Sequence, residues 1–453
     1  MARALLHRVP MTDQAVDGRE TRRERPQVVV VGAGFGGLAA ARRLGSEKVG
    51  VVVVDRENHH LFQPLVYEVS MAALSAPAVS APIRSVLARY DDTRVVLAEA
   101  RQVALDRRLV ITDHGELPYD YLVLAAGMEP SYFGHDDWEA LAPSPKGLDA
   151  ALEIRKRVLL AFEEAEWTAD PARRRRLLEF VVVGGGPTGV EFAGALADLS
   201  QVTLARDFRH IDPRATCVHL VEAGPRVLPT FPEDLSRKAD RDLRQLGVVV
   251  HTASAVVDVD RDGVTLANGK RIESATVIWS AGVRPVQVVR SLDAPHDRQG
   301  RVIVEKDLSL PGHPEAFVIG DAARYEQDGA ELPGIAPVAI QQGRAVARNI
   351  ARDLRGRERR AFRYLDKGML ATIGRNRAVG IVFGLHVSGL IAWLAWALVH
   401  IAYLVGFRNR FIVMLEWTWT YLTFKRGARV IEGLHPPREP SKLTWRRPEA
   451  AAR

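Results

Sequence analysis

The sequence has 453 residues, of which 47% are hydrophobic and 26% are charged, and its formal net charge is +7. This length and composition indicate a globular protein of two or three domains, each with its own core. The single cysteine, Cys217, excludes a disulfide framework and a metal site built from cysteines, so we expect a small buried residue there and no metal. The basic excess suits solvated surface or anionic lipid, and no basic run with interleaved aromatic residues resembles a nucleic-acid-binding module.

The first 26 residues are polar and rich in arginine, without the apolar stretch of a secretory signal. Because they also contain Asp13, Asp17, Glu20 and Glu24, we expect a disordered tail and not an organelle transit peptide. The catalytic body is therefore expected in the cytoplasm.

Ordered structure is expected to begin with an apolar, β-branched strand over 27–31, followed by a glycine-rich turn and a helix over 38–44. The turn contains Gly32, Gly34, Phe35, Gly36 and Gly37. Gly32 permits a tight turn, Gly34 lets the backbone approach a pyrophosphate, and Gly37 allows close packing of helix on strand. The N–H groups and positive dipole end of the helix then favour the phosphates. A second strand over 49–54 ends in Asp55, whose carboxylate suits the ribose hydroxyls of adenosine.

The same pattern recurs in the middle of the chain. A strand over 180–183 leads into a second glycine turn and a helix, and a strand over 218–221 ends in Glu222. The residues of this second motif are Gly184, Gly186, Pro187, Thr188 and Gly189. Each unit is followed by a predicted meander of short strands, which ends at Ala126 and Gly127 in the first half and at Gly282 in the second. Two complete copies predict two nucleotide sites, one for a resident nucleotide and one for an exchanged nucleotide.

Glu222 bears on the choice between NADH and NADPH. A carboxylate there accepts hydrogen bonds from a ribose 2′-OH and repels a 2′-phosphate. We therefore expect NADH, although Arg226 is near enough in the sequence to soften that preference.

Residues 318–323 predict a strand that ends in Gly320 and Asp321. With the two glycine motifs, this segment resembles the two-dinucleotide-binding flavoproteins, which have a glutathione-reductase-like α/β fold with two Rossmann-like domains. The resemblance implies that the first motif, Asp55 and Arg56 bind FAD non-covalently, with Gly320 and Asp321 on its ribityl chain and phosphate. It implies that Ala126 and Gly127 also contact FAD, and that the second motif, Glu222 and Gly282 bind NADH. It also implies an FAD domain split over 27–145 and 298–375, with an NADH domain over 146–297 between the two parts.

Many members of that superfamily pass electrons through a cysteine pair beside the flavin. A thiol–disulfide relay needs two sulfurs within reach of each other. Because the sequence has one cysteine, this chemistry is excluded. The electrons must leave the reduced flavin directly, for a quinone, for oxygen or for another protein.

Near the C-terminus, residues 378–407 contain no Asp, Glu, Lys or Arg, and this stretch exceeds the roughly 20 residues of a spanning helix. Glycines interrupt it, however, and His386, Trp393 and His400 would line one stripe of a helix. We therefore expect a helix lying in the membrane interface, and we keep a spanning helix and a buried dimer interface as alternatives.

The segment over 411–424 has the same character. Helical spacing would place Asn409, Glu416, Thr420 and Thr423 on one face and Phe411, Leu415, Trp419 and Leu422 on another. Lys425, Arg426 and Arg429 would then meet anionic headgroups. The sequence thus predicts amphipathic membrane-anchoring helices over 376–432, followed by a tail over 433–453.

These segments together resemble the type II NADH:quinone oxidoreductases. The resemblance extends from Gln27 to about Ile431 and rests on the stretches 55–65, 184–191, 336–343 and 366–375. It implies a single-chain enzyme that oxidises NADH and reduces a membrane quinone by two electrons through FAD, without pumping protons. We expect a homodimer attached to the cytoplasmic face of a bacterial cell membrane.

The resemblance assigns catalytic roles to Glu191, Gln341, Gln342 and Lys367. Glu191 would feed protons to the quinone site, although an acid in a first helical turn is also stabilised by the helix dipole alone. The two glutamines suit a quinone carbonyl, or else simply open a helix. Lys367, if partly desolvated, would polarise a quinone oxygen or relay a proton, and is otherwise a surface lysine.

Two other functions remain open. A soluble NADH oxidase or ferredoxin-type reductase would use both nucleotide sites but leave the apolar C-terminal helices without a role. A membrane redox sensor would retain its nucleotide and turn over slowly. The sequence does not distinguish ubiquinone from menaquinone.

Overall fold

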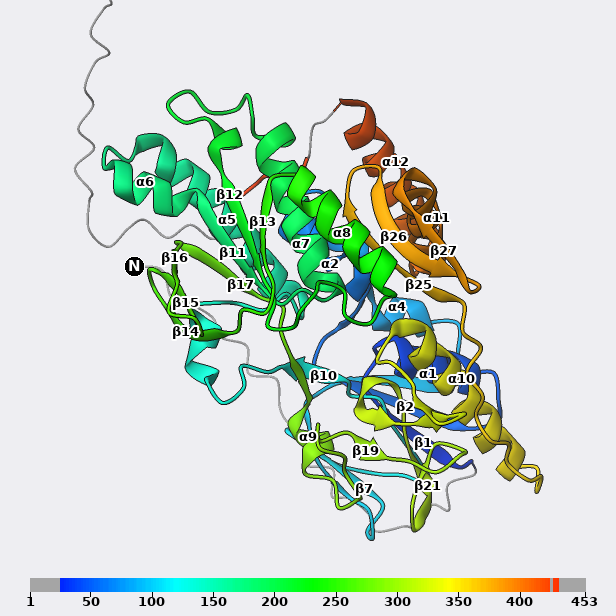
Figure 1. Cartoon of the computed structure of the whole chain (residues 1–453). Coiled ribbons are helices and arrows are strands. Elements are labelled where there is room, and N and C mark those ends of the chain that lie inside the picture. Colours follow the sequence, from blue (N-terminus) through cyan, green and yellow to red (C-terminus); the bar gives the residue numbers. More distant parts are fainter. Residues whose placement is uncertain (1–24, 424–426, 432–453) are drawn as a thin grey trace, which may run out of the picture.

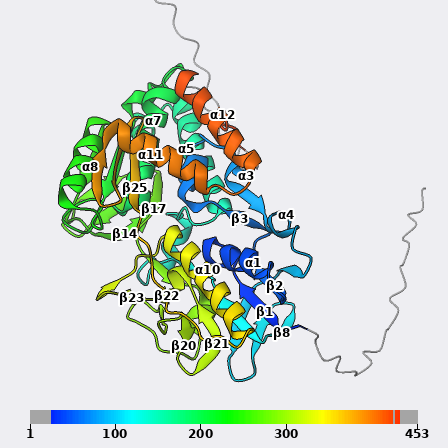
Figure 2. The same ribbon diagram turned by 90° about the vertical axis from the view of Figure 1, so that its right-hand side faces the viewer.

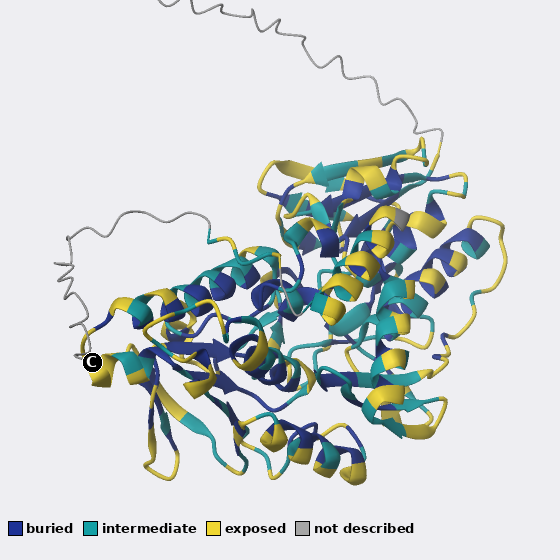
Figure 3. Ribbon diagram, turned by 90° about the horizontal axis from the view of Figure 1, so that it is seen from above, coloured by how far each residue is buried: buried dark blue, intermediate teal, exposed yellow. Residues whose placement is uncertain are grey.

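The computed structural model describes residues 25–423 and 427–431. This part includes only the last two residues of the predicted N-terminal tail. It leaves out Lys425, Arg426 and the predicted tail over 433–453. Two sheets with their helices form the body, one above the other in Figure 1. Figure 3 shows buried residues concentrated in the strands and on the inner helix faces.

The first Rossmann unit is a six-stranded sheet of order β20-β21-β9-β1-β2-β5. Its strands are β20 (Ser309–Leu310), β21 (His313–Val318), β9 (Tyr121–Leu124), β1 (Gln27–Val31), β2 (Gly50–Asp55) and β5 (Thr93–Leu97). All pair in parallel except β20. Both faces of β1 are covered: Val28 and Val30 pack towards helix α1 (Phe35–Leu44), whereas Val29 and Val31 join a separate core. Cover on both faces explains the unbroken run of valines.

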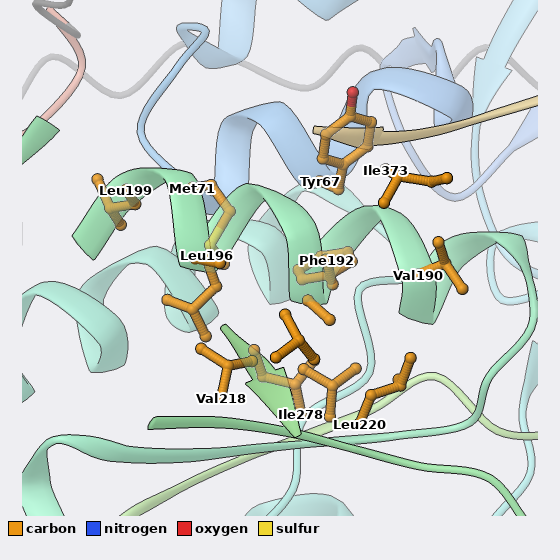
Figure 4. Close-up of a cluster of buried hydrophobic side chains, with 14 of the residues drawn as sticks. Tyr67, Met71, Val190, Phe192, Leu196, Leu199, Val218, Leu220, Ile278 and Ile373 are labelled. Atoms are coloured by element: carbon orange, nitrogen blue, oxygen red, sulfur yellow. The ribbon is translucent and has the colours of Figure 1, made fainter. Parts of the chain in front are cut away.

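The second Rossmann unit is a parallel sheet of order β13-β12-β11-β17. Its strands are β13 (Val248–His251), β12 (Cys217–Val221), β11 (Glu179–Val183) and β17 (Thr276–Trp279). Helices α5 (Leu148–Trp167), α7 (Pro187–Asp198) and α8 (Glu233–Gln245) accompany it. Figure 4 shows side chains of α7, including Phe192 and Leu196, above Val218, Leu220 and Ile278 of the sheet.

Each unit carries a three-stranded antiparallel meander. The first comprises β6 (Ala100–Ala104), β7 (Leu109–Thr112) and β8 (Gly115–Pro118), and the second β14 (Val256–Asp260), β15 (Gly263–Leu266) and β16 (Arg271–Glu273). The meanders predicted from the sequence are therefore confirmed.

A two-stranded ribbon joins the units. Strand β10 (Met128–Pro130) leaves the first unit and pairs antiparallel with β18 (Val283–Pro285), which returns from the second. Arg284 on β18 forms an ion pair with Glu129 on β10 at 2.9 Å. The chain passes between the two units at both β10 and β18, and the pairing of these strands fixes the relative placement of the units.

The described chain has further strands and α-helices. The strands are β3 (His59–Leu61), β4 (Ser80–Pro82), β19 (Val302–Ile303), β22 (Ala323–Arg324), β23 (Glu326–Gln327) and β24 (Ala330–Glu331). The helices are α2 (Val66–Ser70), α3 (Ala76–Val79), α4 (Ile83–Leu87), α6 (Pro171–Leu177), α9 (Gln287–Arg290) and α10 (Ala336–Asp353).

The C-terminal region consists of a sheet and two helices. Strands β25 (Gly368–Gly374), β26 (Arg377–Val382) and β27 (Leu385–Ser388) form the sheet, which straddles the predicted boundary at 375. Helices α11 (Gly389–Tyr403) and α12 (Phe407–Thr423) follow on the same side of the molecule (Figure 2). In the described residues, no helix is both long and apolar enough to cross a bilayer.

The single helical stripe expected for His386, Trp393 and His400 is wrong, because His386 lies on β27. β-branched residues favour strands over this stretch, and positive φ angles at Phe383 (47°) and Gly384 (84°) form the two-residue turn between β26 and β27. The absence of charge over 378–407 therefore arises from a hairpin followed by one helix of 15 residues.

Two contacts between elements require glycine. Helix α10 crosses α1 so closely that a Cβ on Gly343 would collide with the backbone oxygen of Gly36. Strand β25 lies against α7 so closely that a Cβ on Gly194 would collide with the backbone oxygen of Ile373. The first contact places α10 beside the first glycine turn, and the second places β25 beside Glu191.

We predict that Gly343→Val destabilises the protein by at least about 2 kcal/mol, because the backbone of α1 cannot move aside without disturbing the glycine turn. Thermal unfolding and flavin content after gel filtration measure the effect. Gly50→Ala is the matched control, since its Cβ would come no closer than 3.9 Å to another residue. Equal stability of the two variants would contradict the importance of the α1–α10 contact.

Candidate functional site

The two glycine turns have the same geometry. Gly32 (φ 93°) and Gly184 (φ 104°) adopt left-handed conformations, and added Cβ atoms there would strike the backbone of Ala125 and Ala281. A Cβ on Gly37 or on Gly189 would collide with the carbonyl oxygen of the first glycine of its own turn. These contacts hold each helix against its strand.

Gly34 and Gly186 differ from these glycines, because a Cβ on either would meet no described residue within 4 Å. They precede α1 and α7, and in the described chain no side chain caps either helix start. Each glycine therefore borders free space at the positive N-terminal end of a helix, and such a position suits the pyrophosphate of a dinucleotide. Phe35, Gly36, Pro187 and Thr188 form the first helical turns, as the motifs require.

The two strand-terminal acids are held in equivalent ways. Asp55 accepts hydrogen bonds from the amides of Ala33 (2.6 Å) and Glu57 (2.8 Å). Glu222 accepts from the amides of Gly185 and Gly224, both at 2.6 Å. Each carboxylate is therefore fixed beside its glycine turn, where its remaining lone pairs suit ribose hydroxyls.

The guanidinium of Arg226 is hydrogen-bonded to the backbone a few residues further along the chain. Its guanidinium donates to the carbonyl oxygens of Phe231 (2.7 Å) and Pro229 (2.8 Å). These bonds use two of its five N–H groups.

Gly320 and Asp321 line a pocket together with Met128, Tyr325 and Gln342. Gln342 is buried, and its Oε1 accepts a hydrogen bond from the amide of Gly320 at 2.6 Å. This bond fixes the Gly320–Asp321 segment to α10. The amide nitrogen of Gln342 is the part of this side chain that remains to bind a ligand.

The remaining predicted nucleotide contacts lie at the ends of strands. Ala126 and Gly127 follow β9, and Gly127 has a positive φ of 72°. Gly282 follows β17 with a φ of 74°, next to the ring of Phe133. Arg56 is exposed just beyond Asp55.

Glu191 lies on α7 between β25, α2 and α11. The pKa of Glu191 is raised to about 8, mainly by burial and also by the charge of nearby Glu68, whereas the Thr372 amide and the Trp396 indole oppose the shift. A carboxyl group with such a pKa is mostly protonated at neutral pH. A helix-dipole acid would have the opposite shift, because a helix N-terminus stabilises the anion.

A row of aromatic rings connects the first glycine turn with α11. Phe35 packs edge-on against Phe62 (5.6 Å between centroids), Phe62 against His400 (6.2 Å), and His400 lies 4.3 Å from Trp396. Burial lowers the pKa of His400 to about 4, so this ring is neutral. One helix of the C-terminal region thus forms a wall of the candidate site.

Gln341 lies on α10, and Lys367 directly precedes β25. Gln341 exchanges two hydrogen bonds of 3.0 Å with the backbone of Leu365. Lys367 is exposed at the start of β25, so the partial desolvation expected for it is absent from this structure. The extended segment before β25 leaves its side chain on the surface.

Several residues of the site come together only in the fold. Glu68 and Trp396 act on Glu191 only because α2 and α11 converge on α7, and His400 lies against Trp396. Lys146 is placed near Asp321, where burial lowers the pKa of its ammonium and the aspartate opposes that shift. His60 is buried, and its Nδ1 lies 2.9 Å from the carbonyl oxygen of Ala33, as a hydrogen bond requires.

We predict that Glu191 makes stability depend on pH. Its pKa rises from 4.5 to about 8 on folding, so its contribution is fully present below pH 4.5 and is lost as pH rises through about 8. Relative to the wild type, Glu191→Gln should therefore gain thermal stability progressively over this range. The melting temperature as a function of pH tests the prediction, with exposed Glu163→Gln as control. Parallel curves for wild type and Glu191→Gln would contradict it.

Comparison with known proteins agrees with this geometry. Residues 26–343 match the pyridine nucleotide-disulphide oxidoreductase family, and residues 367–426 match the NDH2 C-terminal domain. The chain is 43% identical over 422 residues to the type II NADH:quinone oxidoreductase Ndh of Mycobacterium tuberculosis, covering 90% of each protein. It is 29% identical over 375 residues to the Staphylococcus haemolyticus type II NADH:quinone oxidoreductase, covering 81% of this chain and 92% of the relative.

Among solved structures, the fold resembles NDH2 from Plasmodium falciparum in complex with NADH. The TM-score is 0.80 at 20% identity, over 88% of this chain and 99% of the other. The sulfide:quinone oxidoreductase of Aquifex aeolicus follows the same fold with a TM-score of 0.70 at 19% identity, over 88% of this chain and 95% of the other. On the strength of the family match and the 43% identity, the chain belongs to the type II NADH:quinone oxidoreductase family.

Proposed function

We propose that this protein oxidises NADH and reduces a quinone by two electrons, and that it does so while attached to a membrane surface. FAD, when bound, accepts a hydride from NADH and passes two electrons to the quinone. We assign FAD to the first glycine turn, with Asp55, Gly320 and Asp321, and NADH to the second, with Glu222. The corresponding domains are 27–145 with 298–375, and 146–297.

One observation carries the proposal: helix α11 presents different faces to the redox site and to the surroundings. Its inner face includes Ala392, Trp396 and His400, of which Trp396 is buried beside Tyr67 and Trp417. Its outer face includes Ile391 and Leu398, which are 71% and 70% exposed. The same helix therefore borders the site of Glu191 and offers apolar side chains to whatever lies outside.

Helix α12 repeats this arrangement. Asn409 is buried and donates to the carbonyl oxygen of Ser80, and Glu416 faces inward enough for burial to raise its pKa. The exposed apolar and aromatic residues of the two helices form what we call the outer apolar face: Leu390, Ile391, Leu394, Leu398, Val399, Phe411, Met414, Leu415, Trp419, Tyr421 and Leu422. Exposed apolar residues on two adjacent helices, with Asn409 and Glu416 turned inward, suit a lipid bilayer and not water.

Arg429 has a different partner from the anionic headgroups expected for it. Arg429 forms an ion pair with Asp207, so it is held by the protein and not directed only towards headgroups. Attachment by the outer apolar face therefore does not depend on Arg429. We place the protein on the cytoplasmic face of a bacterial cell membrane.

Reduction of a quinone also consumes two protons, and Glu191 is suited to hold one of them. With a pKa of about 8, its carboxyl is protonated at neutral pH and close enough to neutrality to release that proton. Glu68 lies near enough for its charge to act on Glu191, so loss of one proton disfavours ionisation of the other group.

On the quinone side, we assign Gln342, Gln341 and Lys367 to binding. Gln342 lines the pocket and has its amide nitrogen left as a donor, whereas Gln341 holds Leu365 and thus the segment that leads to Lys367. Lys367 is exposed at the start of β25 and would approach a quinone oxygen only at the membrane surface.

Anaerobic stopped-flow spectroscopy tests the proposed function. NADH should bleach the flavin of the purified protein, and a short-chain quinone should restore its colour and support many turnovers, while NADPH should react slowly. Bleaching without quinone-dependent turnover would contradict the proposal. If oxygen alone supports turnover in a parallel aerated assay, the alternative of a soluble NADH oxidase is favoured.

We predict that Glu222→Gln lowers the preference for NADH over NADPH at least about tenfold, since repulsion between charges about 4 Å apart near a surface amounts to a few kcal/mol. The ratio of kcat/KM for the two nucleotides is the measurement. Asp55→Asn is the matched control in the other repeat: it should weaken flavin retention and leave this ratio unchanged. An unaltered ratio in Glu222→Gln would remove the role assigned to the carboxylate.

We predict that Leu394→Asp with Leu398→Asp weakens binding to anionic phospholipid vesicles more than about tenfold, because each exposed leucine contributes up to about 2 kcal/mol when buried. Cosedimentation measures binding, and NADH oxidation with a soluble acceptor should persist. Val257→Asp, at a residue 49% exposed on β14, is the control.

A different result would identify another partner for this face. If light scattering without lipid shows a wild-type dimer and a monomeric double variant, while vesicle binding is unchanged, the outer apolar face is the interface of the expected homodimer. Lipid attachment by this face would then be wrong.

A further inference from the structure

Four chemically reactive side chains gather on one face of the second Rossmann sheet. Cys217 and His219 lie on β12, Glu179 on β11 and His251 on β13. Strand alternation places them on the face opposite α7, because Val218, Leu220 and Val250 face the core beneath that helix. Neither nucleotide turn nor quinone site uses them.

Three of these side chains converge on one point. His219 Nε2 lies 2.7 Å from Glu179 Oε2 and 3.4 Å from Cys217 Sγ. The three potential ligand atoms all lie within 4.8 Å of one another. Tetrahedral zinc with ordinary bond lengths needs ligand atoms about 3.3–3.6 Å apart, so Glu179 Oε2 must move away from His219 Nε2 to admit the ion.

The fourth residue orients the central one. His219 Nδ1 lies 3.1 Å from His251 Nε2, and the two rings are stacked with centroids 5.3 Å apart. A histidine ligand typically donates its second N–H to such an acceptor, and this bond fixes the tautomer that exposes Nε2 to a metal. The second imidazole therefore supports a ligand without being one.

We propose that Glu179, Cys217 and His219 form a binding site for a zinc-class divalent transition metal, with His251 as the supporting hydrogen-bond partner. One thiolate, one imidazole and one carboxylate are a ligand set that suits zinc and disfavours magnesium or calcium. All three ligands are partly accessible, so water completes the tetrahedron. The expectation of no metal considered only cysteine ligands, and the other two ligands come together only in the fold.

The site is separate from the redox chemistry. Glu179 begins β11 whereas the glycine turn follows its end, about 13 Å away for four residues of strand. Metal binding displaces the thiol proton of Cys217 and the proton between His219 and Glu179, so two protons are released and no electron moves. The metal would clamp β11 to β12 and stabilise the second unit.

Zinc titration of the chelator-treated, FAD-loaded full-length protein tests the proposal, with a chromophoric chelator as competitor. We expect one equivalent of tightly bound zinc and a rise in melting temperature. Cys217→Ser and His219→Gln should each weaken binding at least tenfold, and His251→Asn about tenfold. His210→Gln breaks another histidine–carboxylate pair, with Glu166, and should change nothing.

Cobalt gives an independent readout, since thiolate ligation produces a charge-transfer absorption visible in the difference spectrum against the metal-free flavoprotein. This absorption should vanish in Cys217→Ser, where one atom is exchanged at nearly constant volume. Flavin content and melting temperature without metal establish that each variant is folded, and His219→Gln provides the second loss-of-ligand test. Failure to bind an equivalent of zinc, or binding that survives both substitutions as well as it survives His210→Gln, would overturn the proposal.

Discussion

The contact of strand β25 with helix α7 at Gly194 determines the character of the site. No side chain fits between the two elements at this point, so the backbone of β25 lies directly on α7 and brings the amide of Thr372 to Glu191. Helix α11 then covers the same region with Trp396. A carboxyl group in the first turns of a helix would ordinarily be an exposed anion. Here its surroundings keep it neutral at physiological pH, and a proton is stored beside the place where two nucleotides and a quinone would meet.

The second organising feature is the duplication of the nucleotide unit. Both copies use a left-handed glycine, an open glycine before the helix and an acid held by turn amides. Because the copies are joined by the β10–β18 ribbon, the ends of two parallel sheets face one region. The C-terminal sheet and helices add what a pair of Rossmann units lacks, namely a wall of aromatic rings on the inside and an apolar surface on the outside. Family membership and structure thus lead to the same enzyme through different observations.

Local chemistry made much of this predictable. The glycine turns, their strands, Asp55 and Glu222 are specified by neighbouring residues, so their placement follows from spacing. Residues that depend on distant segments had no such signal: Gly194 and Gly343 are required by elements far along the chain, and Glu68 and Trp396 reach Glu191 only through tertiary packing. The hairpin over 377–388 was missed because an uncharged stretch fits a helix and a strand equally well until the turn at Phe383 and Gly384 is considered. Gln342 was predicted beside the quinone, and its bond to Gly320 also gives it a part in shaping the flavin-side pocket.

Infrared difference spectroscopy of Glu191 tests the central claim most directly. Spectra of the oxidised protein, recorded as a pH titration and subtracted from those of Glu191→Gln, isolate the carbonyl band of the neutral carboxylic acid. The account predicts that this band is present at neutral pH and disappears with a midpoint near pH 8. A Glu191 that is already ionised at neutral pH, with a midpoint in the ordinary range of a glutamate, would contradict the account.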